Sequence, residues 1–389
     1  MNLSVTKKEL EIHEALQKLK MKSGSHSPSI QTLKSLNSGL EIKVDACFLS
    51  NPYATELFLE YLKSDILDNN NLREYLEYYP SQNAEIAKKI SPVIGVDHEN
   101  ILVGNGASEL IETICNHLVI KNFHIYLPTF SSYYEFVDKS VKKEFYTLDE
   151  SNGFEINVDE YIEDIKRVKP HTLLLINPNN PTGSYISKSD VKKIIEECDF
   201  CENIILDESF VHFAYEDSSL DLVNYYDWVN QYNNLIIIKS MSKDFGIAGI
   251  RVGYSVMAKE KVASFLKNGY LWNSNGLAEY FLNLYGNRSF LDKYEIVRKN
   301  YINETMNFMN ELKSIKNMDT YPSKANFVLA KIPSEINCDV LCSLLLIRYG
   351  LYTRNCNDKI GLKGQYIRIA SRSSSENILI KECFNEALG

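Results

Sequence analysis

Residues 235–254 read LIIIKSMSKDFGIAGIRVGY, and this stretch decides the fold of the chain. The run Leu235–Ile238 holds four aliphatic residues with no polar break, which predicts a strand buried on both faces. The strand ends in a turn that carries a lysine, Lys243. A lysine at the end of a buried strand is a candidate reactive group, although a solvated lysine in a polar loop is an equally good interpretation of this stretch alone.

The residues around this lysine indicate what it could react with. Ser240 and Ser242 supply two hydroxyls, and Arg251 supplies a guanidinium eight positions after Lys243. This set suits a phosphate dianion. An amine beside a bound phosphate can form a Schiff base with an aldehyde, and pyridoxal 5′-phosphate carries both groups. The stretch therefore predicts a site for this cofactor.

Length and composition limit the class of protein. A chain of 389 residues exceeds the roughly 250–300 residues at which one hydrophobic core stops growing, so two domains are expected. The formal net charge of −9 argues against nucleic acid as a partner, because such binding needs a basic surface. No apolar run approaches the roughly 20 residues of a membrane span, so no membrane partner is expected.

The cysteines favour a cytoplasmic location. Eight are scattered along the chain, which is typical of reduced core thiols. Cys198 and Cys201 form a C-x-x-C, but the pair closes a helical pattern and no second pair is near. We therefore expect no metal site. The segment 1–22 is charged along most of its length and lacks the apolar core of a signal peptide.

The central part of the chain alternates short aliphatic strands with helices. This pattern predicts an α/β fold, a mostly parallel sheet flanked by helices, whose ligand groups gather beyond the carboxyl ends of the strands. The strands are expected at 101–103, 124–127, 172–176, 203–206, 235–238 and 252–257. Beyond about residue 270 the pattern changes to that of a smaller α+β domain. The predicted division is an N-terminal arm, 1–45, that packs on the small domain, a large cofactor-binding domain, 46–268, and the small domain, 269–389.

A glycine-rich turn follows the first of these strands. Gly106, Ala107 and Ser108 open a helix there, so free backbone N–H groups and the helix dipole point at one spot, as an anion site requires. Short turns of this kind are common, and on its own this one is also explained as a structural turn.

Three further positions lie just past predicted strands. The loop 177–183, NPNNPTG, is longer than a chain reversal needs and presents Asn180, which could donate to a phenolic oxygen. Asp207 closes a strand in a partly desolvated place, where its carboxylate could keep a pyridine nitrogen protonated. Phe130 could stack on a planar ring. Taken singly, Asp207 is also explained as a helix cap or turn former, and Phe130 as a core residue.

Together these motifs resemble a known family. NPNNPTG, LDES and SMSKDFGIAGIRVGY resemble the fold-type I pyridoxal-phosphate enzymes, within them the class I/II aminotransferases, and most nearly the branch of histidinol-phosphate aminotransferases and threonine-phosphate decarboxylases. The resemblance covers about residues 45–389, and its motifs are jointly very specific.

The resemblance implies a role for each motif residue. Lys243 would form the Schiff base and move the proton between substrate and cofactor, Asp207 would pair with the ring nitrogen, and Asn180 would bind the ring oxygen. Phe130 would stack on the ring. Tyr79 would reach the cofactor phosphate of a partner subunit, which implies a homodimer. The phosphate would be held by Gly106, Ala107, Ser108, Ser240, Ser242 and Arg251.

The substrate side rests on four residues. Asn51 lies in an Asn-Pro turn that resembles the family's N-terminal substrate segment. Arg354, Arg368 and Arg372 are guanidiniums suited to bidentate capture of a carboxylate or phosphate. Arg368 matches the arginine that aminotransferases use for the substrate carboxylate. Surface arginines on an α+β domain are the alternative interpretation, above all for Arg372.

Two positions depart from the pattern of histidinol-phosphate aminotransferases. Phe210 stands where many aminotransferases have a tyrosine that bonds the ring oxygen, and threonine-phosphate decarboxylases are similar to the chain in this. Phe130 stands where histidinol-phosphate aminotransferases tend to have tyrosine. The segment Trp272–Ala278 resembles the decarboxylase pattern, but it also resembles aminotransferases of small aminoalkyl phosphates or phosphonates.

Three functions follow as hypotheses. The leading one is an aminotransferase of a small phosphorylated or phosphonate amino or keto substrate, in a surface-polymer or small-metabolite pathway. The alternative is a decarboxylase of phosphoserine or phosphothreonine, which differs in the bond to Cα that stands perpendicular to the cofactor ring. A remote alternative is a cofactor-binding regulator without catalysis, which the acidic composition and the presence of Lys243 disfavour.

Overall fold

The computed structural model describes residues 5–22, 24, 26–36, 40–267 and 274–389. Contacts between Cα atoms group the chain into two compact units. The predicted domain boundaries at 45/46 and 268/269 stay predictions, because such grouping does not test which segments fold independently. Unit 1 comprises Met1–Leu49, Asn180–Gly183 and Ile302–Gly389; unit 2 comprises Ser50–Asn179 and Ser184–Tyr301.

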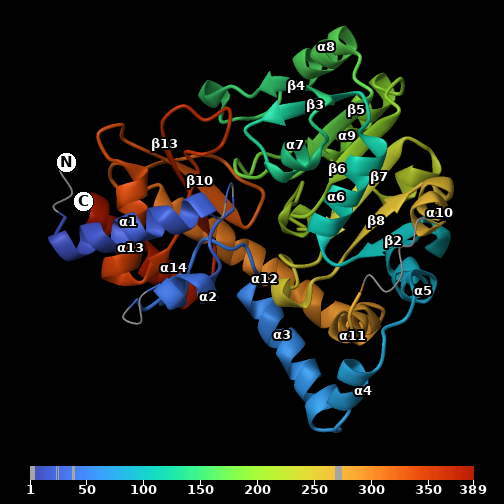
Figure 1. Cartoon of the computed structure of the whole chain (residues 1–389), viewed down its shortest axis with the longest axis horizontal. Coiled ribbons are helices and arrows are strands. Elements are labelled where there is room, and N and C mark those ends of the chain that lie inside the picture. The colour runs from blue at the N-terminus through green and yellow to red at the C-terminus, as the bar shows by residue number, and fades with distance from the viewer. Residues whose placement is uncertain (1–4, 23, 25, 37–39, 268–273) are drawn as a thin grey trace. The chain divides into compact units, whose positions relative to one another are not determined.

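Unit 2 is built on a seven-stranded sheet with the strand order β2-β8-β7-β6-β5-β3-β4 (Figure 1). All neighbouring pairs are parallel except those of β8, which runs antiparallel to both β2 and β7. The predicted mostly parallel α/β sheet is therefore confirmed. The strands are β2 (Ile101–Gly104), β3 (Asn122–Leu127), β4 (Lys142–Thr147), β5 (Thr172–Ile176), β6 (Asn203–Asp207), β7 (Leu235–Ser240) and β8 (Gly253–Met257).

Helices flank this sheet, and several of them bury an apolar face. In α6 (Ala107–Leu118) the residues Leu110, Ile111 and Ile114 recur at helical spacing and pack into the same core as the aliphatic residues of β5 to β7. The other helices are α3 (Pro52–Leu62), α4 (Leu72–Glu77), α5 (Asn83–Ile94), α7 (Ser132–Phe136), α8 (Val158–Val168), α9 (Lys188–Glu197), α10 (Lys259–Lys267) and α11 (Gly276–Tyr285). The helix α12 (Arg288–Leu312) begins in unit 2 and ends in unit 1. A π-helical turn, η1 (Lys63–Leu67), and the 3₁₀ turns η2 (His98–Asn100), η3 (Glu150–Asn152), η4 (Val211–Phe213), η5 (Tyr226–Asn230) and η6 (Ala248–Ile250) complete the helical segments.

One strand of the sheet was not expected from the sequence. β4 reads KKEFYT, and no residue within it is buried. It lies at the edge of the sheet, where charged residues are common because only one neighbour pairs with the strand. A search for buried aliphatic runs therefore cannot detect it.

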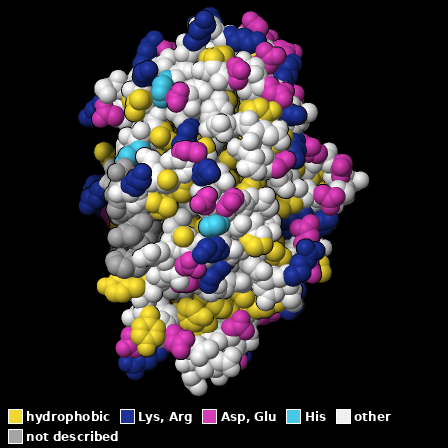
Figure 2. All heavy atoms as spheres, turned by 90° about the vertical axis from the view of Figure 1, so that its right-hand side faces the viewer, with side chains coloured by type: hydrophobic (Ala, Val, Ile, Leu, Met, Phe, Trp, Pro, Cys, Tyr) yellow, Lys and Arg dark blue, Asp and Glu magenta, His cyan; other side chains and the backbone are white. Residues whose placement is uncertain are grey.

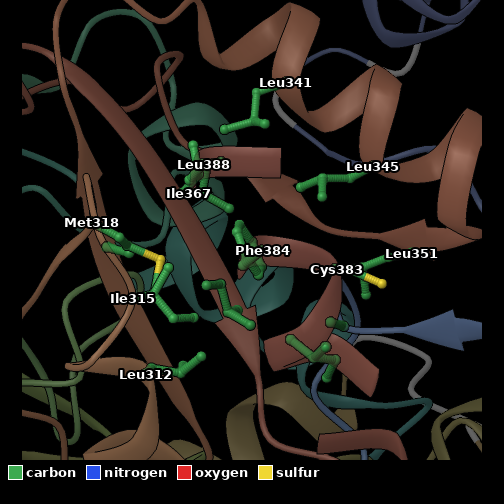
Figure 3. Close-up of a cluster of buried hydrophobic side chains, with 14 of the residues drawn as sticks. Leu312, Ile315, Met318, Leu341, Leu345, Leu351, Ile367, Cys383, Phe384 and Leu388 are labelled. Carbon is green, nitrogen blue, oxygen red and sulfur yellow. The ribbon is translucent and has the colours of Figure 1, made fainter. Parts of the chain in front are cut away.

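Unit 1 holds a four-stranded antiparallel sheet with the order β12-β13-β10-β9 and a short parallel pair, β1 with β11. One of its core clusters joins α13, α14 and the inner strands, with Leu345, Ile367 and Phe384 all completely buried (Figure 3). The elements are α1 (Lys7–Lys22), α2 (Ile30–Leu36), β1 (Val44–Asp45), β9 (Asp319–Thr320), β10 (Phe327–Ile332), α13 (Cys338–Tyr349), β11 (Leu351–Tyr352), β12 (Arg354–Asn355), β13 (Gln365–Ala370) and α14 (Ser374–Leu388).

The N-terminal helix α1 packs on α13 within unit 1. His13 Nδ1 lies 2.8 Å from Ser343 Oγ, and Arg348 Nε donates to Glu9 Oε1 at 2.6 Å. The hydrogen bond from Arg348 lowers the pKa of Glu9 to about 2. Polar contacts thus border the apolar cluster that contains Leu16.

None of the described helices is both long and apolar enough to cross a membrane. No group of three His, Cys, Asp or Glu side chains in the described ranges could hold a metal ion. The eight cysteines are free thiols, and all but Cys342 are buried.

The core of unit 1 yields a matched test of stability. Ile380 and Ile378 both lie in α14, but Ile380 is completely buried while Ile378 is 56% exposed. Ile380→Ala should lower the free energy of unfolding by about 2–5 kcal/mol, because it removes buried methyl groups and leaves a cavity. Ile378→Ala should change it by no more than about 0.5 kcal/mol. Denaturant unfolding of both variants measures the difference, and equal losses would contradict the described packing.

Candidate active site

The register of three strands in unit 2 brings the predicted phosphate-binding residues together. Gly253, at the start of β8, pairs with Gly104 of β2 on one side and with Ser240 of β7 on the other. The turn after β2 leads directly to the N-terminus of α6 at Ala107, where no side chain caps the free backbone N–H groups. Ser240 and this helix terminus are therefore held on either side of one short strand.

Gly106 and Arg251 complete this arrangement. Gly106 has a φ of 85°, and a side chain there would collide with the guanidinium of Arg251. That guanidinium donates to the carbonyl of Ala248 at 3.0 Å and to the carbonyl of Asn105 at 3.4 Å. A guanidinium beside an uncapped helix N-terminus is the donor set of a phosphate site. The observed geometry fits the phosphate of the predicted cofactor.

The remaining two predicted phosphate ligands differ in exposure. Ser242 is buried, and its N–H donates to Ser240 Oγ at 3.3 Å. Ser108, in the first turn of α6, is exposed. Ser108 follows Ala107 at the start of α6, and Ser242 follows the end of β7.

Asp207 lies at the carboxyl end of β6 and is buried. Its Oδ2 accepts from the hydroxyl of Tyr133, and its Oδ1 accepts from the N–H of Ser209, each at 2.8 Å. Burial raises the pKa of this carboxyl, while the two hydrogen bonds oppose the rise. A desolvated carboxylate of this kind is stabilised by a cation, and a protonated ring nitrogen is such a cation.

The loop that carries Phe130 is tied to the loop after β5. Thr129 Oγ1 donates to Asn179 Oδ1 at 2.7 Å, and Asn179 Nδ2 donates to the carbonyl of Pro128 at 2.9 Å. Both loops lie beyond the carboxyl ends of their strands. Phe130 itself is half-buried and belongs to the edge of the apolar core under α6.

The backbone of Lys243 is fixed by the start of α3. Its carbonyl accepts from the N–H of Asn51 at 2.8 Å. Asn51 is completely buried and caps α3, because its Oδ1 accepts from the N–H groups of Tyr53 and Ala54. Its Nδ2 has no hydrogen-bond partner within the described part of the chain. The predicted substrate residue Asn51 is thus adjacent to Lys243, and its substrate role stays a prediction.

A cluster of buried charges lies beside the cofactor residues. Lys239 Nζ lies 2.5 Å from Asp244 Oδ2, which also lies 3.0 Å from His212 Nδ1. Glu208 is completely buried, accepts from the hydroxyl of Tyr226, and has its pKa raised to about 8 by burial. We name Lys239, Glu208, His212 and Asp244 the buried charge cluster.

The members of this cluster alternate with cofactor residues along the chain. Lys239 precedes Ser240, Glu208 follows Asp207, and Asp244 follows Lys243. Successive side chains of a strand point to opposite faces, so Lys239 and Ser240 at the end of β7 face opposite sides of the sheet. The ion pair of Lys239 with Asp244 links the end of β7 to the turn that carries Lys243.

Unit 1 holds Asn180 together with Arg368. The Oδ1 atom of Asn180 accepts from Arg368 at 2.7 Å, which leaves its Nδ2 as the donor that the phenolic oxygen of the predicted cofactor requires. Arg368 also donates to the carbonyl of Cys47 at 2.7 Å. Its Nε is buried and has no hydrogen-bond partner among the residues that the structure describes. This donor is available for an anionic ligand.

The other predicted substrate and partner residues lie in different surroundings. Arg354 is buried opposite Arg368 on the neighbouring strand and donates to Asp358 Oδ2 at 2.6 Å. Arg372 lies 3.5 Å from Glu376 Oε1 at the start of α14. Tyr79, after α4, is 83% exposed. The structure thus brings Arg354 close to Arg368 and gives Arg372 an acidic neighbour of its own.

Sequence reasoning missed three participants in these sites. Tyr133 lies one helical turn after Phe130, but only the fold shows that its hydroxyl reaches Asp207. Lys359 lies in the turn after β12 and is buried, which a lysine in a polar sequence does not indicate. Lys239 and Asp244 both lie within the stretch 235–254, but the sequence does not show that they form an ion pair. Of the predicted decarboxylase-like segment, Trp272 and Asn273 lie outside the described residues.

Comparison with known proteins assigns the chain to a family. Residues 48–378 match the model of the family "Aminotransferase class I and II". The chain belongs to this family, which confirms the predicted class of fold-type I enzymes and its cofactor, pyridoxal 5′-phosphate. The chain is also 32% identical, over 80% of its length and 85% of the relative, to histidinol-phosphate aminotransferase 2 of Archaeoglobus fulgidus.

Two curated relatives and one solved structure are more similar. An L-serine phosphate decarboxylase of Campylobacter jejuni is 47% identical over 96% of this chain and 95% of its own. An L-serine phosphate decarboxylase of Sulfurospirillum multivorans is 44% identical over 94% of this chain and 93% of its own. The structure of a decarboxylase from Sulfurospirillum multivorans superposes with a TM-score of 0.94 at 42% identity, covering 98% of this chain and 97% of that one.

These relatives correct one prediction. The sequence was expected to encode an aminotransferase of a phosphorylated or phosphonate substrate, with decarboxylation as the alternative. The relatives at 47% and 44% identity are decarboxylases, so the aminotransferase prediction is wrong and the findings support the alternative. The aminotransferase was preferred because transfer is the commoner activity in the family that the motifs resemble, and the motifs themselves do not specify which bond to Cα breaks.

The buried charge cluster generates a prediction about stability. Lys239→Met should lower the free energy of unfolding by about 3–5 kcal/mol, because it leaves the carboxylate of Asp244 buried without its ammonium partner. The double variant Lys239→Met/Asp244→Asn should recover part of this loss, since the buried charge is then gone as well. Denaturant unfolding gives the three values.

The exposed ion pair of Lys193 with Asp159 supplies a control of the same kind. Lys193→Met should leave the unfolding midpoint unchanged, because both side chains are largely solvated. A Lys239→Met variant as stable as Lys193→Met would show that the buried pair does not stabilise the strand ends.

Proposed function

We propose that this chain is a pyridoxal-phosphate-dependent decarboxylase of L-serine phosphate. The observation that carries the proposal is the identity of 47% and 44% with two L-serine phosphate decarboxylases over at least 93% of either chain. Decarboxylation breaks the bond between Cα and the carboxylate and replaces it with a bond from Cα to a proton. The products are carbon dioxide and phosphoethanolamine.

The cofactor ligands in this proposal are those that the resemblance implies, and all but Asn180 belong to unit 2. When bound, the cofactor provides an electron sink for the pair of electrons released at Cα. Asp207 holds a proton on the ring nitrogen, since its desolvated carboxylate is stabilised by that cation. Asn180 donates from Nδ2 to the phenolic oxygen, and Phe130 lies against the ring. The phosphate is bound by Gly106, Ala107, Ser108, Ser240, Ser242 and Arg251.

Lys243 has two roles in the proposal. Its amine anchors the cofactor before substrate arrives, and afterwards its Nζ delivers the proton that replaces carbon dioxide at Cα. The hydrogen bond from Asn51 to its carbonyl and the buried charge cluster next to it fix the position of its backbone. The lysine can then move its side chain while its main chain stays in place.

The charge of the reacting group decides what the arginines of unit 1 should bind. A decarboxylase that held the substrate carboxylate tightly would stabilise the ground state, because the carboxylate charge is lost in the transition state. The substrate phosphate keeps its charge throughout the reaction. We therefore assign the phosphate to Arg354 and Arg368, with Arg372 and Asn51 as further predicted substrate residues.

A homodimer forms part of the proposal, because the resemblance places Tyr79 at the phosphate of a partner subunit. Apolar side chains are exposed around Tyr79. In the space-filling view, hydrophobic side chains gather at the lower end of the surface, and Figure 1 places α3 and α4 at this end (Figure 2). Such a patch marks an interaction surface. The exposed residues are Leu59, Leu67, Leu72, Leu76, Tyr78 and Tyr79.

We also propose a cytoplasmic location. All eight cysteines are free thiols, and seven of them are buried. Free thiols in this number are typical of a reducing compartment.

The proposal is tested by incubating the holoenzyme with L-serine phosphate and measuring carbon dioxide and phosphoethanolamine. We expect the two products in equal amounts over many turnovers. L-Glutamate in a parallel sample should leave the visible spectrum of the bound cofactor unchanged, because no amino group is transferred. Release of neither product, or conversion of the cofactor to its amine form by glutamate, would contradict the proposal.

Two lysine variants localise the activity. Lys243→Ala should abolish turnover and the visible absorption band of the lysine-bound cofactor. Lys259→Ala removes an exposed lysine in α10 and should change neither. A Lys243→Ala enzyme that kept both band and turnover would remove the assignment of this lysine.

A further inference from the structure

The turn after β12 places a lysine in the interior and an isoleucine at the surface. Lys359 is 8% exposed, while the next residue, Ile360, is 52% exposed. Burial of an ammonium is costly, and exposure of a large aliphatic side chain gains nothing, so the turn is oriented against the hydrophobic preference of its residues. The backbone fixes this orientation, since the N–H of Lys359 donates to the carbonyl of Cys356 at 2.9 Å. A lysine that its backbone holds in the interior is a candidate partner for an anionic group.

The neighbours of Lys359 show where such a ligand would bind. The positive charges of Arg354 and Arg368 act on Lys359, and these two arginines lie directly opposite one another on β12 and β13. The carboxylate of Asp358 is the acidic neighbour, and it accepts a hydrogen bond from Arg354 at 2.6 Å. Three cations of unit 1 therefore act on one another, and the carboxylate of Asp358 bonds to one of them, Arg354. We name Arg354, Lys359 and Arg368 the cation triad.

We propose that Lys359 binds the phosphate of the substrate together with Arg354 and Arg368, and that it selects phosphorylated over unphosphorylated serine. This inference rests on the proposed function and adds a residue to its substrate site. A phosphate monoester carries nearly two negative charges at pH 7 and three acceptor oxygens. The triad matches it in charge, and the buried Nε of Arg368 lacks a partner within the described chain.

The electrostatics of the triad imply a pH dependence. Burial, and then the charge of Arg354, lower the pKa of Lys359 to about 8. The other groups that act on it are Asp358, the thiol of Cys356 and Arg368. Below about pH 8 the free enzyme presents three cations to the phosphate. Above it Lys359 loses its proton and the phosphate loses one partner, so the KM for the phosphorylated substrate should rise with pH.

The test compares three substitutions by KM and kcat for L-serine phosphate between pH 6.5 and 9.5. Lys359→Met should raise KM by about tenfold or more at pH 7, since a hydrogen bond between two charged groups is lost. It should leave kcat and the cofactor spectrum nearly unchanged. Lys359→Arg should keep a low KM and abolish its rise above pH 8, because arginine stays charged. Lys363→Met, an exposed lysine four positions further on, should behave as wild type.

A binding measurement separates this inference from the proposed function. Titration calorimetry of each holoenzyme with inorganic phosphate needs no turnover, and Lys359→Met should bind phosphate about tenfold more weakly than Lys363→Met. Equal phosphate affinity, or a KM of Lys359→Arg that still rises above pH 8, would overturn the role of Lys359. If no variant releases carbon dioxide while the loss of phosphate affinity is observed, the proposed reaction fails and the phosphate site stands.

Discussion

The close approach of one antiparallel strand to its two neighbours is the constraint on which the cofactor site depends. Gly253 of β8 has no side chain, and a Cβ atom there would meet the carbonyl of Lys239 and the N–H of Ala107. Only a glycine lets β8 fit between β2 and β7 at this point. Because it fits, the uncapped terminus of α6, the hydroxyl of Ser240 and the guanidinium of Arg251 reach the same place.

Stability and function are linked in the same strands. Lys239 and Asp244 are completely buried, and each is the immediate neighbour in sequence of a candidate cofactor residue. Such a pair is costly to bury and costly to break, so it specifies one arrangement of the strand end. Unit 1 uses buried charge differently, because its cation triad gathers positive charge that an anionic substrate can neutralise. We propose that the first arrangement positions catalytic groups and that the second binds a ligand.

The candidate site could be proposed from the sequence because parallel strands place their carboxyl ends on one edge of a sheet. Asp207, Asn180 and Lys243 were each singled out as polar residues after an aliphatic run, and their roles stay predictions. The edge strand β4 could not be predicted, because its sequence KKEFYT contains no aliphatic run and none of its residues is buried. Lys359 could not be found either, because burial of a turn residue is a property of the fold. The reaction was misjudged for a related reason: motifs that hold the cofactor are shared, whereas the bond that breaks depends on how the substrate is oriented.

The central claim is that the bond from Cα to the carboxylate breaks while the bond from Cα to hydrogen stays intact. L-Serine phosphate with deuterium at Cα, turned over in ordinary water, tests this directly by mass spectrometry of the phosphoethanolamine formed. The account predicts that every product molecule keeps one deuterium on the carbon that bears the amino group, and that the second hydrogen there comes from solvent. Loss of the deuterium to solvent without release of carbon dioxide would contradict it.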